Sequence, residues 1–423
     1  MRKKKYVHIS ILKEKSVHIS IVNDGIIKKG LLLVFKIFFV FFLLLTFSSS
    51  ATDGVPSQHA RKIVVFKEWF DKEADQDELL RNYGGVKIKH LRLINGTAAY
   101  LPSQAEKDLK GRNEISRIDE DLVIHSLDEI HMAKPKPPQP SQEFPWGIMR
   151  IFAESAWEET TGATIKVAIL DTGIDLDHPD LQGNIKGNVN LIKPNKSGDD
   201  DKGHGTHVAG IVAGLNNEIG VVGVGPDISL YAVKVLNKKG LGYLSDLIDG
   251  LNWCINNEMQ VVNMSFGSLT DNQSFHDAII EAYEAGITQI ASAGNRGENG
   301  GAIEYPAKYP ETIAVSAIDV YENFASFSSF GEEIDLTAPG VDINSAYKKG
   351  AYEIMSGTSM SAPHVTGVVA LVLTTSPKGY DIDKDGTWDP DEIKIKLKEK
   401  AENLGLHPDK QGAGLVRADL TVH

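Results

Sequence analysis

The feature that most constrains the fold is an alternation of short apolar runs with amphipathic helical stretches after residue 145. Strand-like runs lie at residues 165–170, 230–236, 261–264, 287–291 and 313–317. Helical patterns lie at residues 243–257, 274–285 and 359–374. Strands that alternate with helices predict an α/β fold, in which helices cover both faces of a mainly parallel sheet. Such folds place their chemistry at the carboxyl ends of the strands, and Asp171 directly follows one of them.

A smaller pattern precedes this region. Strands are expected at 62–66 and within 86–101, where the chain turns at Asn95-Gly96, and a last strand is expected at 114–125. Helices are expected at 72–83 and 103–112. This βαββαβ order predicts a small α+β, ferredoxin-like domain. The proline-rich stretch at 134–140 indicates an exposed linker and therefore a domain boundary.

The first 51 residues read as a targeting segment. Scattered lysines in residues 1–30 precede an apolar run at 31–47, and three serines and Ala51 follow it. This is the pattern of a secretory signal, which we expect to be cleaved near Ala51. The alternative is an uncleaved membrane anchor, because the run approaches the length that spans a bilayer. Lys36 interrupts the run and favours the signal, so membrane contact is expected only during export.

Charge and cysteine content exclude several classes of protein. The chain carries 44 Lys and Arg against 57 Asp and Glu, a formal net charge of −13. Nucleic acid is therefore not an expected partner, because a polyanion requires a basic face. The clusters of carboxylates are better explained as binding sites for divalent cations than as a surface for nucleic acid. The single cysteine, Cys254, rules out an intrachain disulfide framework and reads as a buried, inert thiol.

Three segments carry residues suited to amide hydrolysis. They are Asp-Thr-Gly-Ile-Asp at 171–175, Gly-His-Gly-Thr-His-Val-Ala-Gly at 203–210 and Gly-Thr-Ser-Met-Ser-Ala-Pro-His at 357–364. The reaction needs a nucleophile, a base and a group that orients the base, which Ser359, His204 and Asp171 could supply. A serine that opens a helix also presents its own N–H to a developing oxyanion, and Asn295 offers a second donor. His207 is expected to pack within the helix.

These segments resemble the signature motifs of the subtilisin family, in that family's chain order Asp, His, Ser. The resemblance covers nearly all of residues 145–423 and implies a serine endopeptidase that acts through an acyl-enzyme. It implies that Asp171 orients the imidazole of His204, which is the general base, while Ser359 attacks the scissile carbonyl. The Asn295 side chain and the Ser359 N–H would form the oxyanion hole. The alternatives are an inactive scaffold that serves as a calcium-binding or adhesion module, and an esterase with the same triad.

The resemblance also implies a cleft in which substrate binds as an added strand. The residues of its two edges are Gly240, Leu241, Gly242, Ser265, Phe266 and Gly267. Glu304 stands where the family usually has a small residue, at the floor of the pocket for the P1 side chain. A carboxylate there would attract Lys or Arg at P1. The other possibility is that Glu304 pairs with Arg296 on the same rim.

Two calcium sites are expected. The first is implied by the resemblance, with oxygen ligands that suit calcium from Gln142, Asp180, Leu215, Asn217, Ile219 and Val221. The second follows from the EF-hand spacing at 381–392, with the turn glycine Gly386 at position 6. Its ligands would be Asp381, Asp383, Asp385, Thr387, Asp389 and Glu392. A solvated polar loop is the alternative there, and a third, weaker site at Glu333 and Asp335, as in some relatives, is left open.

The resemblance finally implies a precursor. Residues 52–127 would be a propeptide that assists folding and blocks the active site as an intramolecular inhibitor. Autocleavage is expected near Leu127. The segment 128–144 then remains as the start of the mature chain, or is trimmed to about Ser141. The whole is expected to be a secreted monomer that acts on proteins and peptides.

Overall fold

The computed structural model describes residues 59–127, 139–297 and 300–423. The expected signal segment and most of the proline-rich linker lie outside these residues. Among the described residues, no helix is both long and apolar enough to cross a bilayer.

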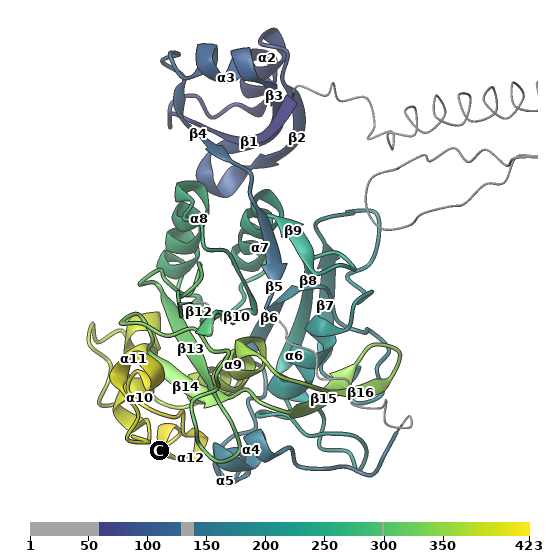
Figure 1. The fold of residues 1–423 in the computed structure, drawn as a ribbon, viewed down its shortest axis with the longest axis vertical. Helices are drawn as coiled ribbons and strands as arrows, with labels where there is room; N and C mark the ends of the chain where they lie inside the picture. The colour runs from purple at the N-terminus through teal and green to yellow at the C-terminus, as the bar shows by residue number, and fades with distance from the viewer. Residues whose placement is uncertain (1–58, 128–138, 298–299) are drawn as a thin grey trace, which may run out of the picture. The chain divides into compact units, whose positions relative to one another are not determined.

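Residues 59–120 form a small α+β unit, shown at the top of Figure 1. Its elements are β1 (His59–Phe66), α2 (Glu73–Asn82), β2 (Val86–Leu91), the 3-10 turn η1 (Arg92–Ile94), β3 (Gly96–Pro102), α3 (Ser103–Leu109) and β4 (Ile115–Glu120). The strands form an antiparallel sheet in the order β2-β3-β1-β4. The prediction of one last strand at 114–125 is wrong, because the chain leaves this sheet after Glu120 and β5 (Val123–Ser126) joins a different sheet.

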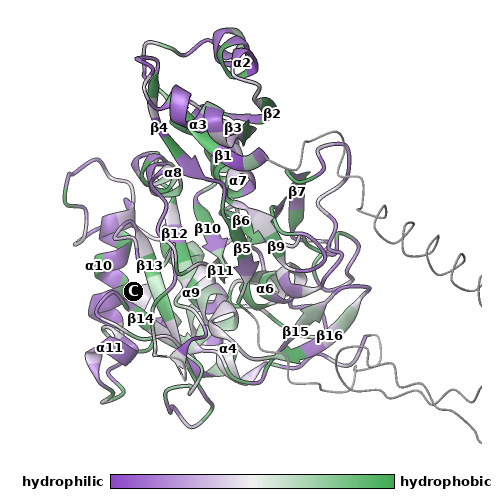
Figure 2. Ribbon diagram, turned by 45° about the horizontal axis from the view of Figure 1, so that its top comes forward, coloured by the Kyte–Doolittle hydropathy of each residue, from purple (hydrophilic) through white to green (hydrophobic). Residues whose placement is uncertain are grey.

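The rest of the chain is built on a parallel sheet in the order β14-β13-β12-β10-β6-β8-β7. Its strands are β6 (Lys166–Asp171), β7 (Ile185–Asn190), β8 (Ser229–Lys234), β10 (Val261–Met264), β12 (Thr288–Ser292), β13 (Thr312–Ile318) and β14 (Leu336–Pro339). The expected α/β fold is confirmed. Figure 2 shows the central strands mainly in the hydrophobic colour, as expected for strands covered on both faces.

Alternation along β6 shows how both faces are buried. Val167 and Ile169 belong to a core with residues of α6 (His204–Ala213) and α9 (Thr358–Leu373). Ala168 and Leu170 belong to a second core with residues of α7 (Leu244–Asn256) and α8 (Gln273–Glu284). Successive side chains of a strand point to opposite faces, so this one strand serves both helical layers.

The remaining helices and one hairpin lie around the parallel sheet. They are α4 (Trp146–Arg150), α5 (Ala153–Ala156), the hairpin β15 (Ile343–Tyr347) and β16 (Ala351–Met355), α10 (Pro390–Lys400), α11 (Pro408–Gln411) and α12 (Ala418–Thr421). Cys254 on α7 is fully buried, as predicted, and burial raises the pKa of its thiol. A buried thiol whose pKa is raised is a poor nucleophile.

A third sheet places β5 between two short strands. β5 pairs antiparallel with β9 (Leu241–Tyr243) on one side and with β11 (Phe266–Gly267) on the other. These partners lie more than a hundred residues further along the chain. The segment that ends at Leu127 is therefore held as a central strand at the carboxyl ends of β6 and β10 (Figure 1).

Candidate active site

The predicted acid and base meet at the end of β6 and the start of α6. Nδ1 of His204 lies 2.7 Å from Oδ1 and 2.8 Å from Oδ2 of Asp171. Both side chains are fully buried. A carboxylate at this nitrogen holds the ring in one orientation and leaves Nε2 as the nitrogen for proton transfer.

Two glycines allow the start of α6 to approach the strand end so closely. Gly203 has φ +112°, a left-handed conformation, and a Cβ there would lie 2.3 Å from the ring of Tyr347. A Cβ at Gly205 would lie 2.1 Å from the carbonyl oxygen of Gly173. A side chain at Gly205 would have to displace the backbone that follows Asp171, and one at Gly203 would be strained and would displace the Tyr347 ring.

Asp200 also organises this junction, a role that was not predicted from the sequence. Its Oδ1 accepts hydrogen bonds from the Gly203 N–H (2.8 Å) and the Thr172 hydroxyl (2.8 Å). Its Oδ2 accepts from the N–H and the hydroxyl of Thr206. The available signal was an acidic residue shortly before a helix start, where a carboxylate satisfies free N–H groups.

The predicted nucleophile faces the carbonyl of Leu127. Oγ of Ser359, the second residue of α9, lies 2.5 Å from the carbonyl oxygen of Leu127. Nδ2 of Asn295 donates a hydrogen bond to the same oxygen at 3.0 Å. The Asn295 amide is fixed in turn, because its Oδ1 accepts from the N–H and the hydroxyl of Thr358, each at 3.0 Å.

The backbone of β5 is paired along both edges of the cleft. In the ladders, Ile124 lies opposite Gly242, and His125 lies between Leu241 and Gly267. The Ser126 N–H donates to the carbonyl of Gly240 at 2.9 Å. The Leu127 N–H lies 3.4 Å from the carbonyl oxygen of Ser265, and Phe266 pairs with Ser126. All six residues predicted to form the cleft therefore contact this strand.

The side chain of Leu127 is buried close to Gly267 and Glu304. Leu127 is 4% exposed and Glu304 is 1% exposed. Oε1 of Glu304 lies 2.9 Å from Nε of Arg296. Of the two possibilities left open by the sequence, the structure shows the ion pair between Glu304 and Arg296.

Comparison with known proteins agrees with this geometry. A sequence model of the Subtilase family matches residues 162–415. The chain belongs to the subtilase family. It is 37% identical over 380 residues to Subtilisin NAT from Bacillus subtilis subsp. natto, which covers 88% of this chain and 93% of that protein. It is 44% identical over 306 residues to M-protease from Shouchella clausii (strain KSM-K16), which covers 72% of this chain and 73% of that protein. The protein is a serine endopeptidase, a hydrolase of peptide bonds.

Two other histidines near the site of this subtilase are not suited to proton transfer at neutral pH. Burial lowers the pKa of His207 to about 3, and its Nε2 lies 3.0 Å from the carbonyl oxygens of Ile343 and Glu353. Burial lowers the pKa of His364 to about 4. Both therefore remain neutral, as expected of packing residues.

The residues of the first expected calcium site lie together. Asp180 is fully buried, and its Oδ2 accepts from the Val221 N–H at 2.8 Å. Its Oδ1 has no hydrogen-bond partner among the described residues. Oε1 of Gln142 accepts from the Asn217 N–H at 2.7 Å, Oδ1 of Asn217 lies 3.2 Å from the Ile219 N, and the Leu215 N–H donates to the Asp180 carbonyl. A buried carboxylate oxygen without a hydrogen-bond partner fits a hard cation such as calcium.

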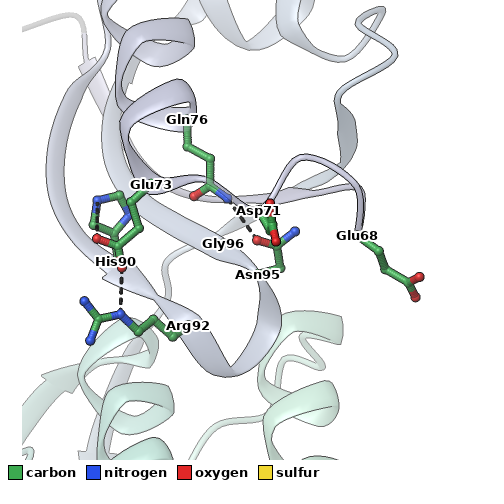
Figure 3. Close-up of a pocket in the computed structure, with 8 residues that line it drawn as sticks. All are labelled: Glu68, Asp71, Glu73, Gln76, His90, Arg92, Asn95 and Gly96. Atoms are coloured by element: carbon green, nitrogen blue, oxygen red, sulfur yellow. Dashed lines mark hydrogen bonds and ion pairs between the residues drawn. The ribbon is translucent and has the colours of Figure 1, made fainter.

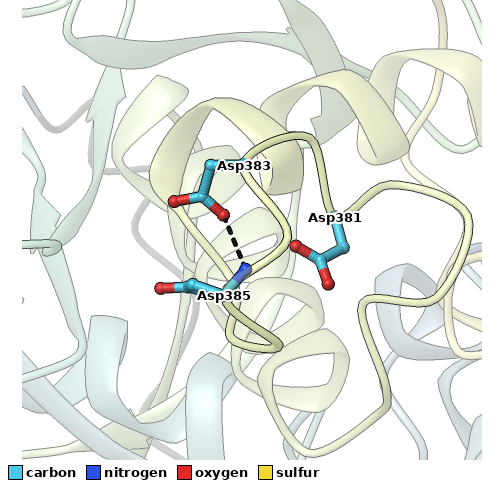
Figure 4. Close-up of side chains that lie close together, drawn as sticks. All are labelled: Asp381, Asp383 and Asp385. Carbon is cyan, nitrogen blue, oxygen red and sulfur yellow. Dashed lines mark hydrogen bonds between the residues drawn. The ribbon is translucent and has the colours of Figure 1, made fainter.

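The second expected site is a cluster of carboxylates before α10. Carboxylate oxygens of Asp381, Asp383 and Asp385 lie within 4.8 Å of one another (Figure 4), and the same holds for Asp383, Asp389 and Glu392. Asp389 and Glu392 also form a capping box at the start of α10. Thr387 donates to Asp385 through its N–H and its hydroxyl. The six predicted positions thus lie in one loop and the first turn of α10, where Glu392 has a structural role as well.

The third cation position finds no support in the structure. The Asp335 carboxylate lies 2.9 Å from Nζ of both Lys394 and Lys398, and Glu333 lies 3.5 Å from Nζ of Lys308. Ammonium groups already balance these carboxylates. These carboxylates therefore do not need a metal ion to balance their charge.

A hollow of about 450 Å³ in the small N-terminal unit is not part of this site (Figure 3). It is lined by Glu68, Asp71, Glu73, Gln76, His90, Arg92, Asn95 and Gly96. Nε of its Arg92 lies 2.6 Å from Oε1 of Glu73, so these two side chains form an ion pair. Figure 3 also shows Gln76 bonded to Asn95. The lining contains no nucleophile beside a base, so it has no arrangement for hydrolysis.

Proposed function

We propose that this subtilase is a secreted, calcium-stabilised endopeptidase that is made as a precursor and cuts its own chain after Leu127. The observation that carries the proposal is the position of the Leu127 carbonyl. Its oxygen lies between Oγ of Ser359 and Nδ2 of Asn295, at the end of a strand paired on both sides. A scissile carbonyl must occupy such a position before attack.

In this mechanism Ser359 attacks the carbonyl carbon of the P1 residue while His204 takes the hydroxyl proton. The paired Asp171 stabilises the imidazolium that forms. Negative charge develops on the carbonyl oxygen, and the Asn295 amide and the Ser359 N–H stabilise it. His204 then gives the proton to the leaving amine, and the peptide bond breaks to leave an acyl-enzyme. A water molecule, deprotonated by His204, hydrolyses this ester and regenerates Ser359.

Residues 52–127 would act as the propeptide. Contacts of two acidic side chains support this role, because each contacts the first turn of a helix that covers the seven-stranded parallel sheet. Asp121 accepts from the N–H and hydroxyl of Ser245 on α7, and Asp119 accepts from the hydroxyl of Ser274 on α8. Carboxylates at helix N-termini satisfy free N–H groups and favour the helix dipole. This arrangement anchors the unit while β5 fills the cleft.

Calcium would bind at the two clusters described above and stabilise the fold. Asp180, with the loop at 215–221 and Gln142, would hold one ion. The loop at 381–392 would hold the second. Bound calcium supplies charge compensation to carboxylates that otherwise repel one another. Secretion is proposed from the apolar run at 31–47 and the small residues that follow it, and a monomer is the proposed state.

The test is to express the wild type, Ser359→Ala and Ser361→Ala, each with calcium and with EDTA. Ser361 is the matched control, because it is a buried serine on the same helix whose hydroxyl has no hydrogen-bond partner among the described residues. We expect wild type and Ser361→Ala to yield a mature chain that begins after Leu127, and Ser359→Ala to stay uncut at that bond. Mass spectrometry reads the new terminus. Cleavage at Leu127 in purified Ser359→Ala would refute the proposal.

A further inference from the structure

Glu304 lies where two side chains of the bound strand can approach it. Side chains two apart on a strand point to the same side, so His125 and Leu127 face the same wall of the cleft. His125 pairs with Gly267, which has no side chain. A Cβ at Gly267 would lie 2.7 Å from Oε2 of Glu304 and 3.1 Å from Cδ1 of Leu127. The missing side chain therefore opens Glu304 to the strand.

The two oxygens of Glu304 differ. Oε1 is paired with Arg296, whereas Oε2 is buried and has no hydrogen-bond partner among the described residues. Nε2 of the His125 ring lies 3.7 Å from Oε2. A carboxylate that is almost fully buried with one oxygen unsatisfied gains from any cation that reaches it.

The identity of the bound strand indicates from which position that cation comes. Leu127, whose carbonyl faces Ser359, is P1, and His125 is P3. The P1 side chain is apolar and buried, whereas the P3 side chain is an imidazole, which can carry a positive charge. Arg296 already balances the charge of Glu304 beneath P1. Oε2 remains for P3.

We propose that Glu304 is a specificity-determining residue that favours a cationic side chain at P3 of peptides with an apolar residue at P1. This inference rests on the proposed endopeptidase activity. The His125 side chain is 40% exposed, so solvent screens the interaction. We therefore expect a preference of about three- to five-fold in kcat/KM for Lys over Ala at P3.

The test uses the mature enzyme and peptides with the sequence of residues 123–130 in which P3 is Lys, Ala or Glu. Wild type is expected to prefer Lys over Ala and Ala over Glu. Glu304→Gln is expected to cleave all three within about twofold of one another. Glu258→Gln, an exposed carboxylate on another loop, removes the same net charge and is expected to keep the wild-type order.

Each outcome separates the inference from the activity on which it rests. If wild type cleaves none of the peptides, the proposed function fails. If it cleaves them with equal kcat/KM, or if Glu304→Gln keeps the order, only the P3 inference is overturned. Salt gives a measurement that needs no variant: 0.5 M NaCl should bring the Lys-to-Ala ratio of wild type close to one. A ratio that salt does not change would also overturn the inference.

Discussion

The contact that most directly tests how the small unit is held is the one that Asp121 makes. Its side chain is fully buried and accepts two hydrogen bonds from Ser245, at 2.9 Å from the N–H and 2.8 Å from the hydroxyl. It also pairs with Arg61, whose side chain is 16% exposed. Its neighbour Glu120 pairs with Lys62 of the same sheet, but its side chain is 60% exposed. The two adjacent acids therefore form a matched pair of buried and exposed carboxylates.

Replacing Asp121 by alanine removes the cap of α7 and leaves the largely buried Arg61 without its carboxylate partner. Loss of an N-cap costs about 1 kcal/mol, and breaking a largely buried ion pair adds roughly 2 kcal/mol. We expect Asp121→Ala to lower the free energy of unfolding of the small unit by about 3 kcal/mol, a factor of roughly 100 in its equilibrium constant. Glu120→Ala should cost less than about 1 kcal/mol, because exposed ion pairs contribute little.

The measurement is amide hydrogen exchange of β1 and β4 in the full chain, in a Ser359→Ala background that prevents processing. Exchange through opening of the unit should be roughly 100-fold faster in Asp121→Ala and change by less than about fivefold in Glu120→Ala. If the two substitutions accelerate exchange equally, capping of α7 does not hold the unit and the reasoning is wrong.

Three further predictions follow from the site and the core. Asp171→Asn should lower kcat by roughly 10⁴-fold with little change in folding, because the amide no longer favours the required tautomer of His204; a loss under tenfold in a kinetic assay would contradict this. Calcium should raise the melting temperature of wild type by roughly 5 °C more than that of Glu392→Gln, which keeps the helix cap but loses a carboxylate; equal responses in calorimetry would argue against the loop site. Cys254→Ala should cost about 1 kcal/mol in denaturant unfolding and leave kcat/KM unchanged, whereas loss of activity would give the thiol a role that its burial excludes.

The sequence predicted the α/β fold, and it indicated catalytic candidates at the ends of its elements, for a physical reason. Each catalytic candidate lies where a strand or helix meets a turn that contains glycine: Asp171, His204 and Ser359. Such a junction can be recognised from a few consecutive residues. Apolar runs and helical periodicity can likewise be recognised from short stretches of sequence. The strand limits differ from the predicted ones by one or two residues, as at β6 and β13.

Features that depend on distant partners could not be predicted in this way. The 114–125 stretch reads as one strand because its apolar residues continue, but β5 pairs with β9 and β11, far along the chain, and not with the sheet of the small unit. The two lysines that balance the charge of Asp335 come from α10, so nothing in the sequence near position 335 predicts these ion pairs. Asp200 was hidden by two acidic neighbours, since only the structure distinguishes the one that meets the start of α6.

The short connection between β4 and β5 has a consequence for the timing of activity. Only Asp121 and Leu122 separate the two strands, so while the chain is intact β5 meets the cleft at the high effective concentration of a tethered ligand. Cutting after Leu127 separates the segment covalently from the enzyme and turns its occupancy into an ordinary equilibrium between two molecules. Dilution then favours release, so a chain exported into a large volume would free its cleft without any further signal. The same chain kept at high concentration would remain largely self-inhibited.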